Sequence, residues 1–240
     1  MAKDKPKKGA DPAQDIRAIE ERAFTRMAPV ISHEIRNPLA IIGNSVYFIK
    51  AKLSAAGPLD PKVEKHLGII DSEIKHANDT LGEILSFTRM RVPAVQAHPF
   101  GALLQAASQS LQKPASIELT IDIPAQDPKV SADSELITRC IIHLLRNAFE
   151  AAGTGSVKAS VRAEAGSAVL EVSDPGPGLA AELDGKLFTP FVTTRPRGIG
   201  LGLAFVRKVV LAHGGAIEAQ SPPGKGAAFR LSLPLFLNEP

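Results

Sequence analysis

The chain of 240 residues has room for one large domain or two modest ones, and 44% hydrophobic with 22% charged residues is an ordinary globular balance. No apolar stretch approaches the ~20 residues that cross a bilayer, and no apolar core follows the N-terminal lysines, so we expect no membrane span and no signal peptide. A net charge of +3 does not indicate nucleic-acid binding. The single cysteine, Cys140, has no partner for an internal disulfide, which favours a reducing, cytoplasmic compartment.

The first half of the chain has the apolar pattern of two long helices. In the first, apolar residues recur every three or four positions at Ile16, Ile19, Ala23, Met27, Ile31, Ile35, Leu39, Ile42, Val46, Ile49 and Leu53. After a break at residues 55–58, Asp60 and Pro61 provide an N-cap and a first helical residue. The second helix repeats the pattern at Val63, Leu67, Ile70, Ile74, Ala77, Leu81 and Ile84. Because two helices cannot cover so narrow a seam, we expect a homodimer that completes a four-helix bundle.

The second half mixes strands and helices without strict alternation, which favours an α+β layer over a doubly wound sheet. Strands are expected over residues 117–123, 157–162, 168–173, 216–220 and 227–233, with the second and third paired as a hairpin. Helices are expected over about 134–152 and 201–212. We therefore divide the chain into a flexible basic tail (1–13), the dimerising hairpin (14–91), a linker (92–99) and a catalytic domain (100–240).

One histidine of the first helix lies off its apolar stripe. His33 is two residues from both Ile31 and Ile35, about 200° around the helix from either, so it should face away from the seam. Glu34 can accept a proton from one imidazole nitrogen, leaving the other as a nucleophile near neutral pH. Asn37 lies one turn further along on the same face.

The segment His33-Glu34-Ile35-Arg36-Asn37-Pro38-Leu39 resembles the H-box of the sensor histidine kinases of two-component systems. This resemblance implies that His33 is the phosphoacceptor, that Glu34 is its general base and that Asn37 orients water for removing phosphate from a partner. A surface asparagine that merely precedes a proline is the plainer reading of Asn37. Pro38 should bend the helix beside His33, unless it is a tolerated proline.

Further segments follow in the order that this family shows, although each alone is a weak signal. Asn147, in His143-Leu144-Leu145-Arg146-Asn147-Ala148, resembles the N-box asparagine that helps to hold Mg²⁺ against the phosphates of ATP. Asp174-Pro175-Gly176-Pro177-Gly178 resembles the G1 box. Its aspartate would accept a hydrogen bond from the adenine amino group, while Gly176 and Gly178 would let the backbone approach the base.

A loop and the start of a helix complete the resemblance. Residues 187–195 resemble the F-box, whose aromatic side chains pack a mobile lid and whose Arg195 could reach phosphate; Thr194 is assigned to the same site. The glycine-rich run 198–203 then enters a helix whose amide groups and dipole attract phosphate. From this run we assign to nucleotide binding Gly198, Gly200, Leu201 and Gly202. Gly224-Lys225-Gly226 resembles a third glycine box or is a hairpin turn.

One residue departs from the family pattern. His143 stands four residues before Asn147, where most histidine kinases carry asparagine and related ATPases carry a catalytic glutamate. The missing carboxylate argues against activation of water and favours transfer to His33. It also leaves part of the usual Mg²⁺ shell in question.

The resemblance implies a homodimeric kinase that uses ATP and Mg²⁺, phosphorylates itself on His33 and donates the phosphoryl group to an aspartate of a response-regulator receiver domain. It also implies that the same chain can act as the phosphatase of that regulator. A chaperone-like or topoisomerase-like clamp would need the absent glutamate. A second alternative is a non-catalytic dimeric scaffold or phosphotransfer module whose ATP site has decayed, and the intact glycine boxes argue against it. Residues 1–15 are too few for a sensor, so we expect a sensing region on a longer parent chain or a separate protein.

Overall fold

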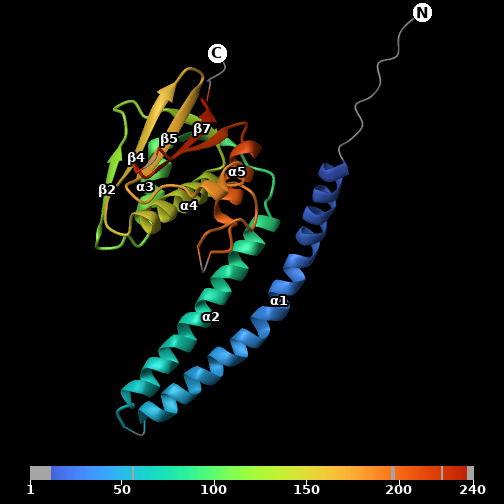
Figure 1. Cartoon of the computed structure of the whole chain (residues 1–240), viewed down its shortest axis with the longest axis vertical. Coiled ribbons are helices and arrows are strands. Elements are labelled where there is room, and N and C mark those ends of the chain that lie inside the picture. Colours follow the sequence, from blue (N-terminus) through green and yellow to red (C-terminus); the bar gives the residue numbers. More distant parts are fainter. Residues whose placement is uncertain (1–11, 56, 196–197, 223, 237–240) are drawn as a thin grey trace, which may run out of the picture. The chain divides into compact units, whose positions relative to one another are not determined.

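The computed structural model describes residues 12–55, 57–195, 198–222 and 224–236, and of residues 12–23 it describes the backbone alone. The chain divides after Met90 into a helical hairpin and a mixed α/β unit (Figure 1). The expected tail over 1–13 lies almost wholly outside the described residues, and the first helix already begins at Pro12. Within the described ranges, no helix is both long and apolar enough to cross a membrane.

Helices α1 (Pro12–Ala55) and α2 (Pro61–Thr88) form the hairpin, as the apolar repeat predicted. Asp60 caps α2, because its Oδ1 accepts a hydrogen bond of 2.7 Å from the backbone N–H of Lys62. Pro61 stands in the first turn, where the amide it lacks would have had no helical partner.

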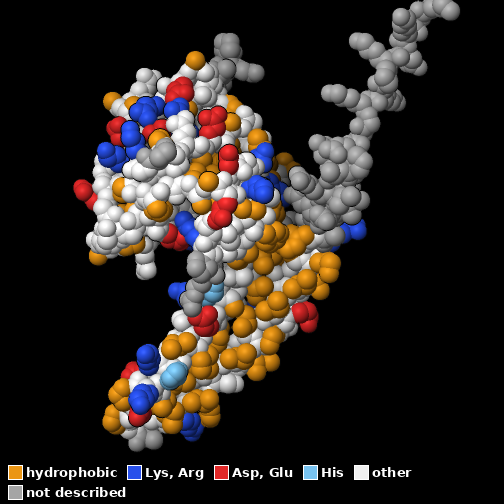
Figure 2. Space-filling model, in the orientation of Figure 1, with side chains coloured by type: hydrophobic (Ala, Val, Ile, Leu, Met, Phe, Trp, Pro, Cys, Tyr) orange, Lys and Arg blue, Asp and Glu red, His pale blue; other side chains and the backbone are white. Residues whose placement is uncertain are grey.

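The hairpin buries only part of its apolar stripe. Val46, Leu67 and Leu81 are enclosed. Other large apolar side chains of the same stripe stay exposed: Met27, Ile31, Ile35, Ile42, Ile49, Leu53, Val63 and Ile70. Figure 2 shows hydrophobic side chains gathered along both helices. An apolar surface of this extent is characteristic of an interaction site, and it is the surface that the expected four-helix bundle would cover.

The second unit is built on a mixed sheet in the order β2-β4-β5-β7-β6. These strands cover Ile117–Asp122 (β2), Gly155–Glu164 (β4), Ser167–Asp174 (β5), Ala216–Gln220 (β6) and Ala227–Pro234 (β7). β2 lies parallel to β4, and the other neighbouring pairs are antiparallel. The β4–β5 hairpin, with Lys158 opposite Ser173, confirms the expected strand pair.

Helices α3 (Phe100–Ser110), α4 (Ser134–Ala152) and α5 (Gly202–Ala212) cover the sheet, with α4 against β4 and β5 and in contact with both other helices (Figure 1). The core between them contains Ile137, Ile141, Leu144, Leu145, Leu170, Val172, Leu231 and Leu233. Cys140 also lies in this core, where burial raises the pKa of its thiol and favours a packing role. The α+β class is confirmed.

Four elements were not expected, namely two short strands, one helix and one 3₁₀ turn. Residues 92–99 were expected to be a linker, but strand β1 (Gln96–Pro99) pairs antiparallel with β3 (Lys129–Ala132) and so belongs to the second unit. Helix α3 was not expected, although its buried residues Phe100, Leu103, Leu104 and Ala107 have helical spacing. The short 3₁₀ turn η1 (Ala181–Leu183) was not expected either.

Candidate functional site

Helix α4 presents Asn147 to an arginine from the loop before α5. The Nη1 of Arg195 donates to Oδ1 of Asn147 at 2.9 Å, and its Nη2 donates to the Asn147 carbonyl oxygen at 3.2 Å. The same guanidinium forms an ion pair with Glu150, which lies three residues further along α4. Two residues with sequence-predicted roles, Asn147 and Arg195, are therefore in direct contact.

Asp174 ends strand β5 with a buried carboxylate. Its Oδ1 accepts a 2.9 Å hydrogen bond from the amide of Gly176, and the amide of Ala227 on β7 also donates to the carboxylate. Burial raises the pKa of Asp174, and these hydrogen bonds and the positive charge of Arg195 only partly oppose that rise. A side chain on Gly176 would begin 2.6 Å from the carbonyl oxygen of Ala151, so only glycine lets the chain pass α4 here.

Two loops meet beside Asp174. The hydroxyl of Ser221 accepts a 2.8 Å hydrogen bond from the amide of Leu179 and donates one of 2.9 Å to the carbonyl oxygen of Gly226. This serine joins the segment that contains Gly178 to the turn before β7 in which Lys225 N–H donates to Pro222. The turn expected at 224–226 is therefore present, and it lies against the expected G1 segment.

The loop before α5 is held partly by its own backbone. Phe191, at a left-handed φ of 64°, donates its amide to the carbonyl of Gly200 at 3.1 Å. Gly200 has φ 72°, and a side chain there would begin 2.6 Å from the carbonyl oxygen of Val192. Thr194 is exposed, and the Gly198 amide donates to the carbonyl of Arg195. These contacts join the described residues on the two sides of this loop, 191–195 and 198–200.

Helix α5 begins at Gly202 after the buried Leu201, and in the described structure no side chain caps it. Its first N–H groups are thus left for another acceptor. The Nδ1 of His143 on α4 lies 3.1 Å from where a side chain on Gly202 would begin, and its ring packs on Phe205 with 5.4 Å between centroids. Burial lowers the pKa of His143 to about 4, helped by Arg146 and Arg139, so the imidazole is neutral at physiological pH.

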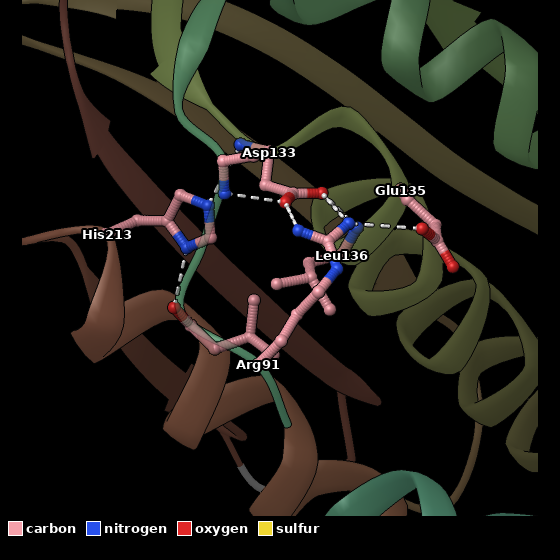
Figure 3. Close-up of polar contacts among 7 residues, drawn as sticks. Arg91, Asp133, Glu135, Leu136 and His213 are labelled. Carbon is pink, nitrogen blue, oxygen red and sulfur yellow. Dashed lines mark hydrogen bonds and ion pairs between the residues drawn. The ribbon is translucent and has the colours of Figure 1, made fainter. Parts of the chain in front are cut away.

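A buried aspartate fixes the start of α4 (Figure 3). Asp133 accepts hydrogen bonds from the amide of Leu136, at 3.2 Å, and from that of Ala94, at 2.8 Å. Arg91 adds two more, at 2.5 and 3.3 Å. Burial alone would raise the pKa of Asp133. The hydrogen bonds from Ala94, Leu136 and Arg91 have the larger opposite effect and hold this pKa below its usual value.

The same aspartate ties α4 to the end of α5. Its backbone N–H donates to Nε2 of His213 at 3.0 Å, and Nδ1 of that ring lies 2.8 Å from the carbonyl oxygen of Val209 (Figure 3). The ring therefore carries its proton on Nδ1 and accepts at Nε2. This contact joins the start of α4 to the end of α5, the two helices that carry Asn147 and the glycine-rich terminus nearer their other ends.

In the hairpin, His33 projects into solvent from α1 with 74% of its side chain exposed, as its position off the apolar stripe predicted. Its Nδ1 lies 3.7 Å from Oε1 of Glu34, close enough for an ion pair but longer than a hydrogen bond. Asn37 and Pro38 are also exposed, and α1 continues through Pro38 as one helix.

Two family models match the two units. One, described as "His Kinase A (phospho-acceptor) domain", matches residues 25–92, and another, described as "Histidine kinase-, DNA gyrase B-, and HSP90-like ATPase", matches residues 132–237. This chain belongs to the histidine kinase family. Both halves of the chain thus carry the domains that the H-box and glycine boxes predicted.

Curated histidine kinases match nearly the whole chain. The sensor histidine kinase ZraS of Escherichia coli (strain K12) is 32% identical over 217 residues, which are 89% of this chain and 46% of ZraS. The sensory histidine kinase/phosphatase NtrB of Rhodobacter capsulatus is 32% identical over 234 residues, 91% of this chain and 64% of NtrB. The chain therefore spans about half of the length of ZraS and somewhat more of NtrB.

Solved histidine kinases have the same fold. Full-length ShkA in complex with AMPPNP gives a TM-score of 0.70 at 25% identity, over 88% of this chain and 46% of that one. The histidine kinase ThkA in complex with the response regulator TrrA gives 0.64 at 24% identity, over 95% of this chain and 68% of that one.

Several contacts around the site of this histidine kinase had no signal in the sequence. Glu150 is 45 residues from Arg195, and Asp133 is 80 residues from His213. Arg91, which was expected to be the last residue of the hairpin, is 42 residues from Asp133. The N-cap position of Asp133, directly before the expected helix, was the one clue available.

Proposed function

We propose that this chain is a kinase core that binds Mg-ATP in the α4/α5 unit, transfers the γ-phosphoryl group to His33 and passes it to an aspartate of a response regulator. The proposal is supported above all by one observation: the phosphoacceptor and ATPase family models match one chain in which His33 is exposed and Asp174 is buried and accepts a backbone hydrogen bond. The whole protein's activity and partners remain part of this proposal.

The nucleotide would be held from two ends. The buried carboxylate of Asp174 accepts N–H donors, so it would accept one from the adenine amino group, and the chain at Gly176 and Gly178 would let the base approach. The uncapped amides at Gly202 would face phosphate, with Gly198, Gly200, Leu201 and Thr194 shaping the approach. Arg195 would add a charge-assisted hydrogen bond to a phosphate oxygen.

A metal ion fits beside Asn147. The guanidinium of Arg195 already lies at its Oδ1, so this oxygen accepts a cationic partner in the structure. Among the described residues no three His, Cys, Asp or Glu side chains gather into a metal cluster, so Asn147 would share the ion with phosphate oxygens. Mg²⁺ would neutralise phosphate charge there. His143 is one turn away and neutral, and it brings no carboxylate for activating water.

The transfer itself needs a neutral imidazole nitrogen as nucleophile. His33 would attack the γ-phosphorus, the bond to the β,γ-bridging oxygen would break, and ADP would leave. Glu34, 3.7 Å away, would take the proton from the other ring nitrogen once the two side chains close that gap. Incubation with γ-labelled ATP tests this: we expect Mg²⁺-dependent label that is acid-labile and alkali-stable. Acid-stable label, or none, would contradict the proposal.

We also propose that the core removes phosphate from its regulator. Asn37 lies one turn, ~6 Å of rise, from His33 and is a neutral side chain that can align water without competing as a nucleophile. The relative NtrB is named a histidine kinase/phosphatase. Asn37→Ala should keep autophosphorylation within roughly tenfold while losing most of the phosphatase activity. If the variant dephosphorylates the regulator as fast as the unaltered chain, Asn37 is structural.

A further inference from the structure

Glu150 has no role in the nucleotide chemistry proposed above, yet it forms an ion pair with Arg195, which does have one. Arg195 divides its donors between Glu150 and Asn147, which stand three residues apart on α4. Asn147 contributes a neutral oxygen and a carbonyl, whereas Glu150 supplies the only full negative charge among the partners described for this guanidinium. Charge-assisted hydrogen bonds are the stronger kind, so Glu150 is what draws Arg195 to the face of α4.

The contact uses the oxygen that metal binding requires. Oδ1 of Asn147 accepts from Arg195 at 2.9 Å, which places a positive charge where Mg²⁺ would be held. Two cations on one amide oxygen repel each other in a partly buried site. The Arg195–Asn147 contact would therefore oppose the binding of a metal ion at this oxygen. Arg195 is also the residue expected to reach phosphate. The movement that takes its side chain away from Asn147 would therefore also bring it to the nucleotide.

We propose that Glu150 is a positioning residue: it holds Arg195 on Asn147 until Mg-ATP displaces the arginine, which then moves to the phosphates. The loop that carries Arg195 has the attachments such an exchange needs. Thr193 Oγ1 accepts from the Arg195 amide at 3.0 Å, and Phe191 and Gly200 close the loop base at 3.1 Å. The Arg195 side chain can then move while these two hydrogen bonds from backbone amides are kept. This inference rests on the proposed ATP site.

A double-mutant cycle in the full chain tests the exchange. Glu150→Gln keeps the shape of the side chain and removes its charge, and Arg195→Gln removes the held group. Calorimetry with AMPPNP and Mg²⁺ should show two- to fivefold tighter binding in Glu150→Gln, the factor expected for a half-exposed ion pair. In the Arg195→Gln background, the same Glu150 substitution should change nothing. Glu118→Gln is the charge-matched control, because Glu118 is an exposed residue of β2. This variant should bind AMPPNP as the unaltered chain does.

The kinetic readout separates positioning from a structural role. KM for ATP should fall with Glu150→Gln by the same factor, while the rate at saturating ATP stays within about twofold, because the contact opposes only binding. Unchanged or weaker AMPPNP binding would overturn the inference. So would a gain that persists without Arg195, since it would reflect general electrostatics. If the unaltered chain binds no AMPPNP, the proposed function fails as well; if it binds and the cycle shows no coupling, only this inference fails.

Discussion

The two units of this chain enclose their apolar side chains to different extents. In the α/β unit, Leu144, Leu170 and Leu231 are fully buried within one copy. In the hairpin, Leu67 is 6% exposed while Ile70, on the same stripe, is 39% exposed, and Ile42 is 46% exposed. The α/β unit therefore completes its own core, and the hairpin needs a further surface. The proposed nucleotide site therefore lies on a unit with its own complete core, whereas the proposed phosphoacceptor His33 lies on a unit that leaves apolar surface uncovered.

The largest expected effect is on the hairpin. Ile70→Glu should leave a folded chain that no longer dimerises, whereas Leu67→Glu should also unfold the hairpin, because it buries a charge inside one copy at a cost of roughly several kcal/mol. Light scattering and far-ultraviolet circular dichroism separate the two outcomes, with the exposed Lys65→Glu as the control. An unaltered chain that is monomeric at micromolar concentration would refute the four-helix bundle.

A smaller effect should be confined to the α/β unit. Asp174→Ala should weaken ATP binding at least tenfold, about 1.5–3 kcal/mol, because a charge-assisted hydrogen bond to adenine is lost. GTP should bind poorly to the unaltered chain, since its 6-oxo group offers an acceptor where Asp174 needs a donor. Calorimetry measures both, and the exposed Asp184→Ala is the control. Equal affinity for ATP and GTP would contradict the role given to Asp174. The Asp174→Ala substitution should leave dimerisation unaffected.

The smallest effect is a pH dependence of stability. The pKa of His143 is lowered from its ordinary value of 6.5 to about 4 in the folded chain. Between pH 4 and pH 6.5 this residue therefore carries a proton in the unfolded chain but not in the folded chain. Stability should therefore fall as pH drops from 7 to 5, by about 1–2 kcal/mol from this residue. Urea unfolding at both pH values measures it. His143→Asn should lack this part of the loss, and an equal loss in the variant would show that His143 is not its source.

Features with long or ordered patterns were predictable from the sequence. The heptad stripe repeats over many turns, so both long helices and the exposure of His33 followed from it. The cap at Asp60 and the β4–β5 hairpin followed from local signals. Strands β1 and β3 have four residues each, too few for a periodic pattern, and Pro99 argues against a strand. Helix α3, in contrast, has buried residues at helical spacing and could have been predicted from them.

Contacts between distant residues could not be predicted from one sequence. Nothing near Arg195 indicates that its partners are Asn147 and Glu150 on α4, because that depends on how the loop folds back. The same holds for the contact between Asp133 and His213. The sequence therefore indicates which candidate site residues share a helix or a loop, whereas the contacts between these segments are seen only in the structure.

The role proposed for His33 is tested most directly by the position of the phosphoryl group after incubation with γ-labelled ATP. Peptide mapping under alkaline conditions should find it on His33 alone, and His33→Gln should lose all acid-labile label while binding ATP as before. His66→Gln, an exposed histidine on α2, should label normally. Acid-labile label that persists in His33→Gln would contradict the central claim.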